Sequence, residues 1–366
     1  MVATCGCDRR RLIYLIGNLM SKSLILDYDL LELTDLLGSW GEPAYRSRQI
    51  WRGLYKNFLQ SPEAFTSLPK KLQTKLGEQL HFTALFPIDI RESSNGQTQK
   101  ILFRLVDGQY IEVVLLRYPH RRTLCISTQV GCAMGCIFCA TGQMGFRRHL
   151  SSGEIVAQVM YYACLLHEKG DRITNVVMMG MGEPFHNYRS TMDAIDRLND
   201  PDGYDFGARR FTISTVGLIP MIYQFADEKR QINLAVSLHA ADDDLRNSIL
   251  PINKRYPLNE LIDACRYYVN QTGRRISFEW TLIHDVNDTP EQAWLLARKL
   301  EGLLCHVNAI PLNPTSGYVG QATSRQRAGM FKAILDKHGI SCTIRNKRGT
   351  LLNAGCGQLR SDHINI

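Results

Sequence analysis

The segment TLCISTQVGCAMGCIFCATG, residues 123–142, decides the fold because it joins a β-rich run to a loop that carries three cysteines. Cys132, Cys136 and Cys139 follow the spacing C-x3-C-x2-C. A structural zinc or a closed iron–sulfur site needs a fourth Cys or His nearby, whereas three thiolates leave one iron open to a small molecule. The spacing therefore indicates a metal centre that binds a ligand directly, and a structural zinc loop with a distant fourth ligand is the alternative.

Downstream of this segment, β-rich runs alternate with amphipathic helical segments. The β-rich runs are TLCIST, TNVVMMGM, RFTISTVG, INLAVSLHA, ISFEWTLI and HVNAIPLNP. The first helical segment, SSGEIVAQVMYYACLLHEKG, begins with a capping box of Ser151 and Glu154. Six β–α units predict an α/β fold with a parallel sheet and helices outside, as a partial (β/α)6 barrel. A doubly wound sheet is the alternative, and the periodicity of the sequence does not distinguish it from a partial barrel.

Distinctive polar residues follow the predicted strands, and parallel strands end on the same rim of a sheet. After the second, third, fourth and sixth strands stand Gly182, Glu183, Ser214, Ser237, Leu238, His239 and Asn313. Glu183 can accept hydrogen bonds from an ammonium group or a ribose, and the serines and the asparagine suit an amino acid and a nucleoside. His239 alone is more often a packed histidine, but as part of this ring it is predicted to contact the ligand.

The residues before the cysteine loop indicate a small basic helical domain. Residues 24–80 have a helical pattern of leucines, broken by glycine and proline. The chain has 43 Lys and Arg against 35 Asp and Glu, a formal charge of +8, which favours a polyanionic partner. Basic clusters occur at Arg46, Arg48, Arg52 and Lys56, at Lys70, Lys71 and Lys75, at Arg117, His120, Arg121 and Arg122, and at Arg147, Arg148 and His149. A solvated basic face explains the same charge without any nucleic acid.

At 366 residues with 45% hydrophobic content, the chain can bury one large core and a small one. We expect a possible N-terminal extension at 1–23, a basic helical RNA-binding domain at 24–90, a β-hairpin or linker at 91–117, a core at 118–349 and a C-terminal loop at 350–366. Asp107-Gly108 between two apolar runs is a hairpin signal.

The chemistry of the cysteines predicts a reducing compartment. Eleven cysteines at irregular spacing do not indicate a disulfide framework. The opening residues have a basic run before a short apolar run, but Asn18 breaks that run and no cleavage site of small residues follows. We therefore expect a cytoplasmic protein without a membrane partner.

Two further cysteines are candidates for thiol chemistry. In GTLLNAGCGQLRSD, residues 349–362, Cys356 stands between two glycines in a segment without a helix or strand pattern. Such a thiol is exposed or mobile and can act as a nucleophile if it reaches the site. Cys125 lies on the first strand and either faces the rim or is a small buried apolar residue.

Together these motifs resemble the radical S-adenosylmethionine RNA adenine methyltransferases. The resemblance rests on YRSRQIW, the cysteine segment, MMGMGEP, STVGLIP, VSLHA, PINKRYPLNELI, IPLNP and AGCGQL. It implies one [4Fe-4S] cluster on Cys132, Cys136 and Cys139, with the amino and carboxylate groups of S-adenosylmethionine on the fourth iron. It also implies that Gly182, Glu183, Ser214, Ser237, Leu238, His239 and Asn313 contact this cosubstrate.

The resemblance implies a mechanism that uses two S-adenosylmethionine molecules per turnover. One methylates the sulfur of Cys356, and the second yields a radical that takes a hydrogen from this methyl group. The resulting carbon radical adds to the adenine, and Cys125 releases the covalent protein–RNA adduct by forming a disulfide with Cys356. Glu112, in the strand YIEVVLL, matches the proton acceptor of the family, and a structural ion pair is its alternative.

The implied substrate is C2 of an adenine in the peptidyl transferase centre of 23S rRNA, together with the adenine 3′ of the anticodon in some tRNAs. A flavodoxin or ferredoxin is the implied electron donor. The alternative within the family is a C8 methyltransferase that confers antibiotic resistance. A radical peptide maturase would not need Cys356 or the helical domain, and a zinc-stabilised RNA-binding protein would not explain the ring of polar residues.

Overall fold

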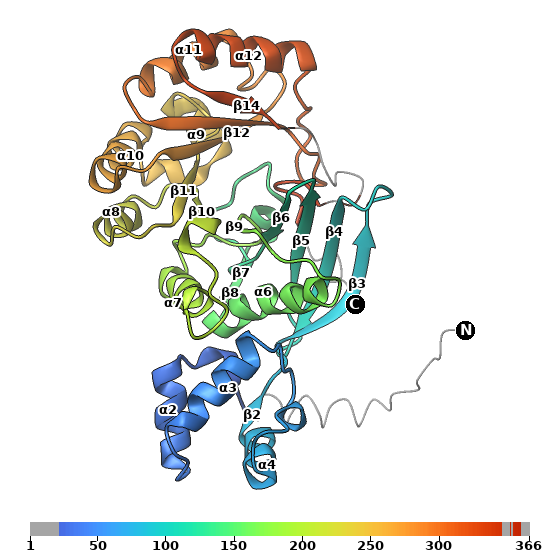
Figure 1. The fold of residues 1–366 in the computed structure, drawn as a ribbon. Coiled ribbons are helices and arrows are strands. Elements are labelled where there is room, and N and C mark those ends of the chain that lie inside the picture. The colour runs from blue at the N-terminus through green and yellow to red at the C-terminus, as the bar shows by residue number, and fades with distance from the viewer. Residues whose placement is uncertain (1–21, 346–351, 353, 360–366) are drawn as a thin grey trace.

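The computed structural model describes residues 22–345, 352 and 354–359, which form a ten-stranded sheet with helices along its outer side (Figure 1). The strand order is β14-β13-β12-β11-β10-β9-β6-β5-β4-β3. The parallel strands are β6 (Arg121–Cys125), β9 (Asn175–Met178), β10 (Phe211–Thr215), β11 (Asn233–Ser237), β12 (Ile276–Leu282), β13 (Cys305–Pro311) and β14 (Cys342–Ile344). The antiparallel strands are β3 (Leu85–Glu92), β4 (Thr98–Leu105) and β5 (Tyr110–Tyr118).

The parallel strands follow one another in chain order, and a helix comes between each neighbouring pair. The connecting helices are α6 (Ser152–His167), α7 (Tyr188–Asn199), α8 (Ile219–Asp227), α10 (Leu258–Thr272), α11 (Pro290–Lys299) and α12 (Arg325–Lys337). The strand order never reverses, as it would in a doubly wound sheet. The partial barrel of six β–α units is therefore confirmed, and β14 adds a strand that the sequence pattern did not indicate.

Local sequence signals explain how α6 begins. The hydroxyl of Ser151 accepts a hydrogen bond from the backbone N–H of Glu154 at 3.1 Å, and the Glu154 carboxylate accepts one from the backbone N–H of Ser151 at 2.9 Å. This is the predicted capping box. A Cβ atom at Gly153 would lie 2.7 Å from the backbone nitrogen of Asp27, so a glycine is required where the N-terminal residues pack against α6.

A small helical unit precedes the sheet, as predicted. It consists of α2 (Leu30–Ser39), α3 (Tyr45–Tyr55) and α4 (Lys70–Gln79), with β1 (Ser23–Leu24) paired to β2 (Leu80–His81). Its buried side chains include Leu33, Leu37, Ile50, Trp51, Tyr55, Phe65, Leu72 and Leu76. An ion pair of 2.9 Å between Arg52 and Asp202 and a hydrogen bond of 3.0 Å from Lys56 to the carbonyl of Pro201 attach α3 to the barrel.

Two consecutive hairpins extend the parallel sheet. Asp107-Gly108 lies in the turn between β4 and β5, as the sequence predicted, and Gly108 has a φ of +83°. The polar residues 93–97 form the turn between β3 and β4, so the hairpin region includes one strand more than the sequence indicated. The edge strand β3 exposes Ile88 and Ile90, and a register shift beside Pro87 interrupts its pairing.

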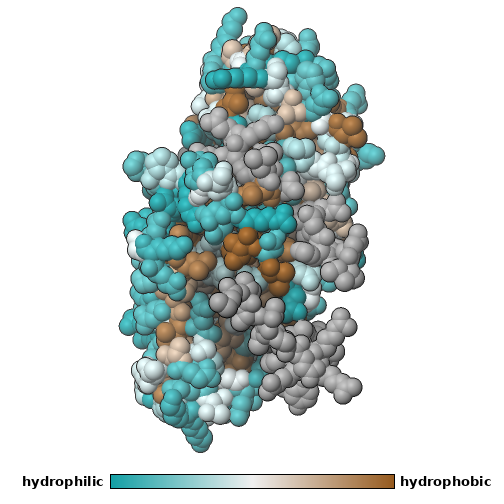
Figure 2. Space-filling model, turned by 90° about the vertical axis from the view of Figure 1, so that its right-hand side faces the viewer, coloured by the Kyte–Doolittle hydropathy of each residue, from teal (hydrophilic) through white to brown (hydrophobic). Residues whose placement is uncertain are grey.

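The face on the β3 side of the molecule is shown in Figure 2, where hydrophobic side chains appear as separate patches among hydrophilic ones. Within the described part of the chain, no helix has the length and apolar character that crossing a bilayer requires.

Candidate active site

A cavity opens where the parallel strands end, and we call it the first cavity. Its walls contain most of the residues that the sequence placed on one rim: Cys132, Cys136, Cys139, Gly182, Glu183, Ser214, Ser237 and His239. These residues come from β10 and β11 and from the loops after β6, β9 and β11. The expected convergence at the carboxyl ends of the strands is therefore present in the fold.

The cysteine loop is held in a compact shape by backbone contacts. It follows the short strand β7 (Gln129–Gly131), which pairs with β8 (Phe146–His149). The N–H of Cys132 donates to the carbonyl of Gly145 at 3.0 Å, and the N–H of Cys139 donates to the carbonyl of Cys136 at 3.1 Å. Gly131 has a φ of +73°, and a Cβ there would lie 1.9 Å from the Gly145 carbonyl oxygen, so this turn requires glycine.

The three thiols suit a cluster better than a single zinc ion. Three thiolates on one tetrahedral zinc would have sulfur atoms about 3.8 Å apart, given Zn–S bonds of about 2.3 Å. Among the described residues, the cysteines do not form a group whose ligand atoms all lie within 4.8 Å of one another. Burial and then the nearby Cys139 and Cys132 raise the pKa of Cys136 well above its usual value. Thiolates at this site need a cation to stabilise them, and an iron–sulfur cluster supplies it.

Glu183 offers a buried carboxylate to the first cavity. Its two oxygens accept hydrogen bonds from the N–H groups of Phe185 at 3.0 Å and Val216 at 2.8 Å. Burial raises its pKa to about 7, although the two backbone donors oppose the shift. The group can therefore change protonation near neutral pH when a cationic ligand binds.

His239 is a neutral donor at the cavity wall. Its Nδ1 accepts a hydrogen bond from the N–H of Thr281 at 2.9 Å, which leaves the proton of the neutral ring on Nε2. Burial lowers its pKa to about 3. The ring meets Phe138 edge-to-face at 4.9 Å between centroids, and the residue has a φ of +62°. The neutral ring suits hydrogen bonding to a ligand.

Another cavity lies between β5, β6, β9 and β13, and we call it the second cavity. Apolar residues dominate its walls, including Val114, Leu116, Val177 and Ile310. Cys125, Asn313, Arg345 and Cys356 also line it. Cys356 lines the first cavity as well, so its thiol belongs to the boundary between the two.

The loop that carries Cys356 is fixed to the cysteine loop by hydrogen bonds. The N–H of Ala140 donates to the carbonyl of Gly357 at 2.7 Å, and the Thr141 hydroxyl donates to the carbonyl of Leu359 at 2.7 Å. The amide of Asn313 donates to the carbonyl of Cys356 at 3.1 Å. These contacts place the thiol of Cys356 where both cavities are accessible to it.

The two candidate thiols are free and electrostatically coupled. Cys125 and Cys356 have no disulfide partner in the structure. Burial raises the pKa of Cys125 to about 12, with a further contribution from Cys356. Cys356 is exposed to the cavities. Desolvation by the surrounding protein raises the pKa of its thiol to about 11, and the nearby Glu279 is the second cause of the increase. Both thiols therefore need a proton acceptor before they act as nucleophiles.

Two predicted site residues line neither cavity. Leu238 is fully buried, and its backbone N–H donates to the carbonyl of Glu279 at 3.0 Å. Glu112 is buried in β5 and forms an ion pair of 2.6 Å with Lys100 on β4. The structure therefore contains the ion pair that the sequence left as the alternative for Glu112.

Sequence reasoning missed Glu279 on β12, which lines the first cavity. Its Oε1 accepts a hydrogen bond from Asn308 at 2.8 Å, and its buried Oε2 has no hydrogen-bond partner among the described residues. Burial raises the pKa of this carboxyl. The sequence feature that could have identified Glu279 is its charge inside the apolar strand ISFEWTLI, because a buried charge is rare without a partner.

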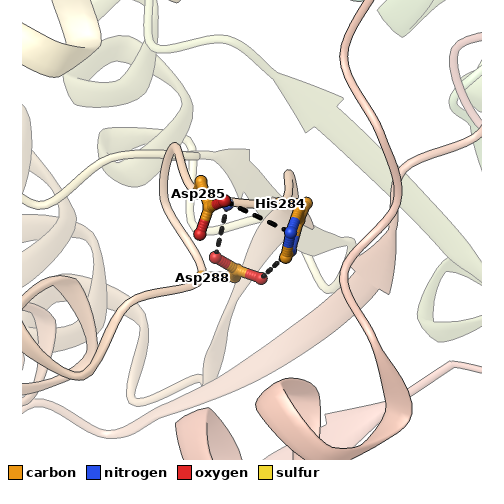
Figure 3. A group of neighbouring side chains, drawn as sticks. All are labelled: His284, Asp285 and Asp288. Atoms are coloured by element: carbon orange, nitrogen blue, oxygen red, sulfur yellow. Dashed lines mark hydrogen bonds and ion pairs between the residues drawn. The ribbon is translucent and has the colours of Figure 1, made fainter.

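A second group of possible metal ligands, His284, Asp285 and Asp288, lies in the loop after β12 (Figure 3). The guanidinium of Arg327 pairs with Asp285 at 2.6 Å and with Asp288 at 2.7 Å, and the Thr323 hydroxyl donates to Asp288. A cation already neutralises these carboxylates, and the network ties the loop to α12. We assign it a structural role.

Comparisons with known proteins agree with this geometry. Residues 126–295 match the family described as the Radical SAM superfamily, and residues 24–81 match the family described as the ribosomal RNA large subunit methyltransferase N-terminal domain. A probable dual-specificity RNA methyltransferase RlmN from Chloroflexus aurantiacus is 48% identical over 355 residues, covering 94% of each chain. The dual-specificity RNA methyltransferase RlmN 1 from Myxococcus xanthus is 48% identical over 91% of this chain and 94% of its own.

A crystal structure of a radical SAM methyltransferase from Sphaerobacter thermophilus has the same fold. It superimposes with a TM-score of 0.91 at 51% identity, over 92% of this chain and 99% of that chain. A match of this extent includes the helical unit, the barrel and the cysteine loop. The chain therefore belongs to the RlmN family of radical S-adenosylmethionine methyltransferases.

Proposed function

We propose that this enzyme methylates C2 of an adenine in the peptidyl transferase centre of 23S rRNA and the adenine 3′ of the anticodon in some tRNAs. The observation that carries the proposal is Cys356, whose thiol lines both cavities. A methyl group accepted from a cosubstrate in the first cavity can be presented to a base in the second.

The first cavity is proposed to hold S-adenosylmethionine. The carboxylate of Glu183 suits the N–H groups of its amino group, and Gly182, Ser214, Ser237 and the Nε2–H of His239 suit its other polar atoms. Asn313 and Leu238 are predicted contacts that lie outside this wall. Asn313 is proposed to act indirectly, by holding the loop of Cys356 through its hydrogen bond to the Cys356 carbonyl. A [4Fe-4S] cluster on Cys132, Cys136 and Cys139, when bound, supplies the electron that cleaves the sulfonium.

Cys356 is proposed to accept a methyl group by displacement: its S–CH₃ bond forms as the sulfonium C–S bond breaks, and S-adenosylhomocysteine leaves. Once the methyl carbon has lost one hydrogen atom and is bonded to both the sulfur of Cys356 and C2 of the adenine, Cys125 attacks the sulfur of Cys356. The S–S bond then forms as the S–C bond to the base breaks, and the released carbon takes a proton. The presence of both residues in the wall of the second cavity supports this role.

The second cavity is proposed to receive the adenine. Its apolar walls suit a flat ring, and Asn313 and Arg345 provide polar groups at its edge. Glu112 has the same side-chain direction as Val114 and Leu116, which line this cavity, because alternate residues of a strand point to one face. As the proposed proton acceptor, Glu112 must act from its ion pair with Lys100.

The helical unit is proposed to bind RNA through its exposed basic residues. Arg48, Lys70 and Lys71 are exposed, whereas Arg52 and Lys56 contact the barrel. Among the basic residues beside the cysteine loop, Arg148 pairs with Asp107 and Glu154, and Arg147 is exposed. A flavodoxin or ferredoxin is the proposed electron donor.

The test is anaerobic turnover of the reconstituted protein with S-adenosylmethionine, a reductant and an rRNA fragment, followed by nucleoside mass spectrometry. We expect 2-methyladenosine. A product of 8-methyladenosine would contradict the C2 assignment and assign the chain to the C8 alternative. Formation of 5′-deoxyadenosine without a methylated nucleoside would contradict the proposed RNA substrate.

A further inference from the structure

Arg246, on α9 (Asp243–Ile249), is a fully buried cation beside the proposed cluster site. Its Nε donates to the carbonyl of Leu238 at 3.1 Å, and one terminal nitrogen donates to the side-chain oxygen of Asn253 at 2.7 Å. The other terminal nitrogen donates to the carbonyls of Val216 at 2.7 Å and Ser237 at 3.3 Å. Every acceptor is a neutral oxygen, and no carboxylate among the described residues lies within 4.0 Å of the guanidinium.

A buried charge without a counterion is costly, even when it is hydrogen-bonded. Burial lowers the pKa of Arg246 to about 10, and the charges that oppose this shift are those of Cys136 first and Asp243 second. The carboxylate of Asp243 already accepts hydrogen bonds of 2.8 Å from Asn253 and from the N–H of Leu258. A thiolate at Cys136 on the cysteine loop would therefore be the main negative charge that acts on Arg246.

The segment around Arg246 packs directly on that loop. The N–H of Ile137 donates to the carbonyl of Ile249 at 3.2 Å. The ring of Pro251 lies 3.7 Å from the position of a Cβ atom at Gly135. The motif PINK, residues 251–254, begins at this contact, and its Asn253 links Arg246 to Asp243.

An iron–sulfur cluster held by three thiolates has a net negative charge that increases when it takes up an electron. A fixed buried cation nearby stabilises the reduced form more than the oxidised form, because the interior screens charges weakly. Arg246 does not line the first cavity, so it acts through its charge and not as a ligand of the cosubstrate. Its hydrogen bonds also hold Val216, whose N–H donates to Glu183.

We propose that Arg246 is the buried counter-charge of the iron–sulfur cluster and makes the cluster easier to reduce. Asp243 opposes this effect, because Asn253 links its carboxylate, a negative charge, to the guanidinium. The inference rests on the proposed cluster site at the three cysteines. Arg246 is thus a positioning and electrostatic residue, without a direct contact to the reacting atoms.

The test is redox titration of the reconstituted enzyme, followed by electron paramagnetic resonance, with iron and sulfide content measured for each variant. For Arg246→Met we expect the equilibrium constant for one-electron reduction to fall about tenfold, equivalent to a midpoint about 59 mV more negative. Arg246→Lys, which keeps the charge, should retain most of the wild-type potential. Asp243→Asn should shift the potential in the positive direction.

A matched control is Arg197→Met. Arg197 is also buried and donates to neutral oxygens, those of Leu26 and Ser152, but it lies between the N-terminal unit and the barrel helices. The Arg197→Met enzyme should be less stable than the wild type, and the midpoint potential of its cluster should be unchanged. An unchanged potential in Arg246→Met with full iron content would overturn the proposal.

If Arg246→Met does not fold, Asp243→Asn is the decisive variant. A more negative midpoint potential in Asp243→Asn, or an unchanged one, would also overturn the proposal. Failure of the proposed function gives a different result. The wild type would then contain no cluster, or it would keep its cluster when Cys132, Cys136 and Cys139 are all replaced by alanine.

Discussion

The two cavities share Cys356 but differ in the chemistry of their walls. The wall of the first contains the carboxylates of Glu183 and Glu279 and the neutral ring of His239. The second is lined mainly by apolar side chains and by no carboxylate among the described residues. Apolar side chains line much of both walls, so the difference lies in the buried carboxylates of the first, which suit a charged cosubstrate. The second has Asn313 and Arg345 as polar groups beside its apolar side chains, which suit a planar base. The difference supports our proposal that the enzyme separates the source of the methyl group from its acceptor and joins them through one thiol.

The largest effect is expected from Cys356→Ala, which removes the thiol shared by the two cavities. RNA methylation should fall below detection because no other thiol among the described residues lines both cavities. Reductive cleavage of S-adenosylmethionine should continue, since the first cavity keeps its remaining groups. The measurement is methylated nucleoside and 5′-deoxyadenosine in the same reaction. Cys164→Ala is the control, because Cys164 lies on α6 and lines neither cavity. Methylation at wild-type yield by Cys356→Ala would refute the shared-thiol account.

Cys125→Ala tests the second cavity alone. The variant should accept the methyl group and attach it to the base, but it lacks the thiol that releases the adduct. Free methylated RNA should fall by more than tenfold, and a covalent protein–RNA species should accumulate. Denaturing electrophoresis with labelled RNA measures both. Free product at wild-type yield without a crosslink would contradict this prediction.

Glu183→Gln tests the first cavity alone. Loss of a charge-assisted hydrogen bond from the amino group of S-adenosylmethionine to the carboxylate should weaken its binding about tenfold or more. The carboxyl has a pKa raised to about 7 by burial, so it is mainly protonated below this pH and must lose its proton to pair with a cation. Wild-type affinity should therefore rise with pH up to about 7 and level off above it. Anaerobic calorimetry measures the profile, and a Glu183→Gln profile parallel to the wild type would exclude Glu183 as the titrating group.

The smallest effect is expected outside both cavities, in the helical unit. Replacing Arg48 and Lys71 by alanine should weaken RNA binding a few-fold. The slope of its salt dependence should decrease by roughly 0.7 to 0.9 for each phosphate that the variant no longer neutralises. Arg189→Ala is the control, since its side chain is 96% exposed on the outer helix α7. Equal effects of the control and the double variant would show that the basic helical unit has no special role in RNA binding.

Much of the fold was predictable because its signals are local. The capping box at Ser151, the turn at Asp107-Gly108 and the six β–α units depend on neighbouring residues alone. The pairing of β3 with β4 and the addition of β14 at the far edge depend on contacts between distant segments, which periodicity does not encode.

The candidate site was predictable where residues follow strand ends, and less so inside the strands and helices. Glu183 and His239 were found because parallel strands end on one rim. The ion pair of Glu112 needs Lys100 from another strand, so the sequence could not decide its role. Arg246 looks like a surface arginine among the acidic residues of its helix, and only the tertiary structure shows that it is buried beside the cysteine loop.

The central claim is that Cys356 carries the methyl group from the first cavity to the second. The direct test is to load the protein with S-adenosylmethionine labelled in its methyl group, remove the free cosubstrate, and map the label by peptide mass spectrometry. Unlabelled S-adenosylmethionine, reductant and RNA are then added. We predict that the label is first on Cys356 and then in the methyl group of the adenine. Methylated RNA that contains only unlabelled carbon, while the label stays on Cys356, would contradict the account.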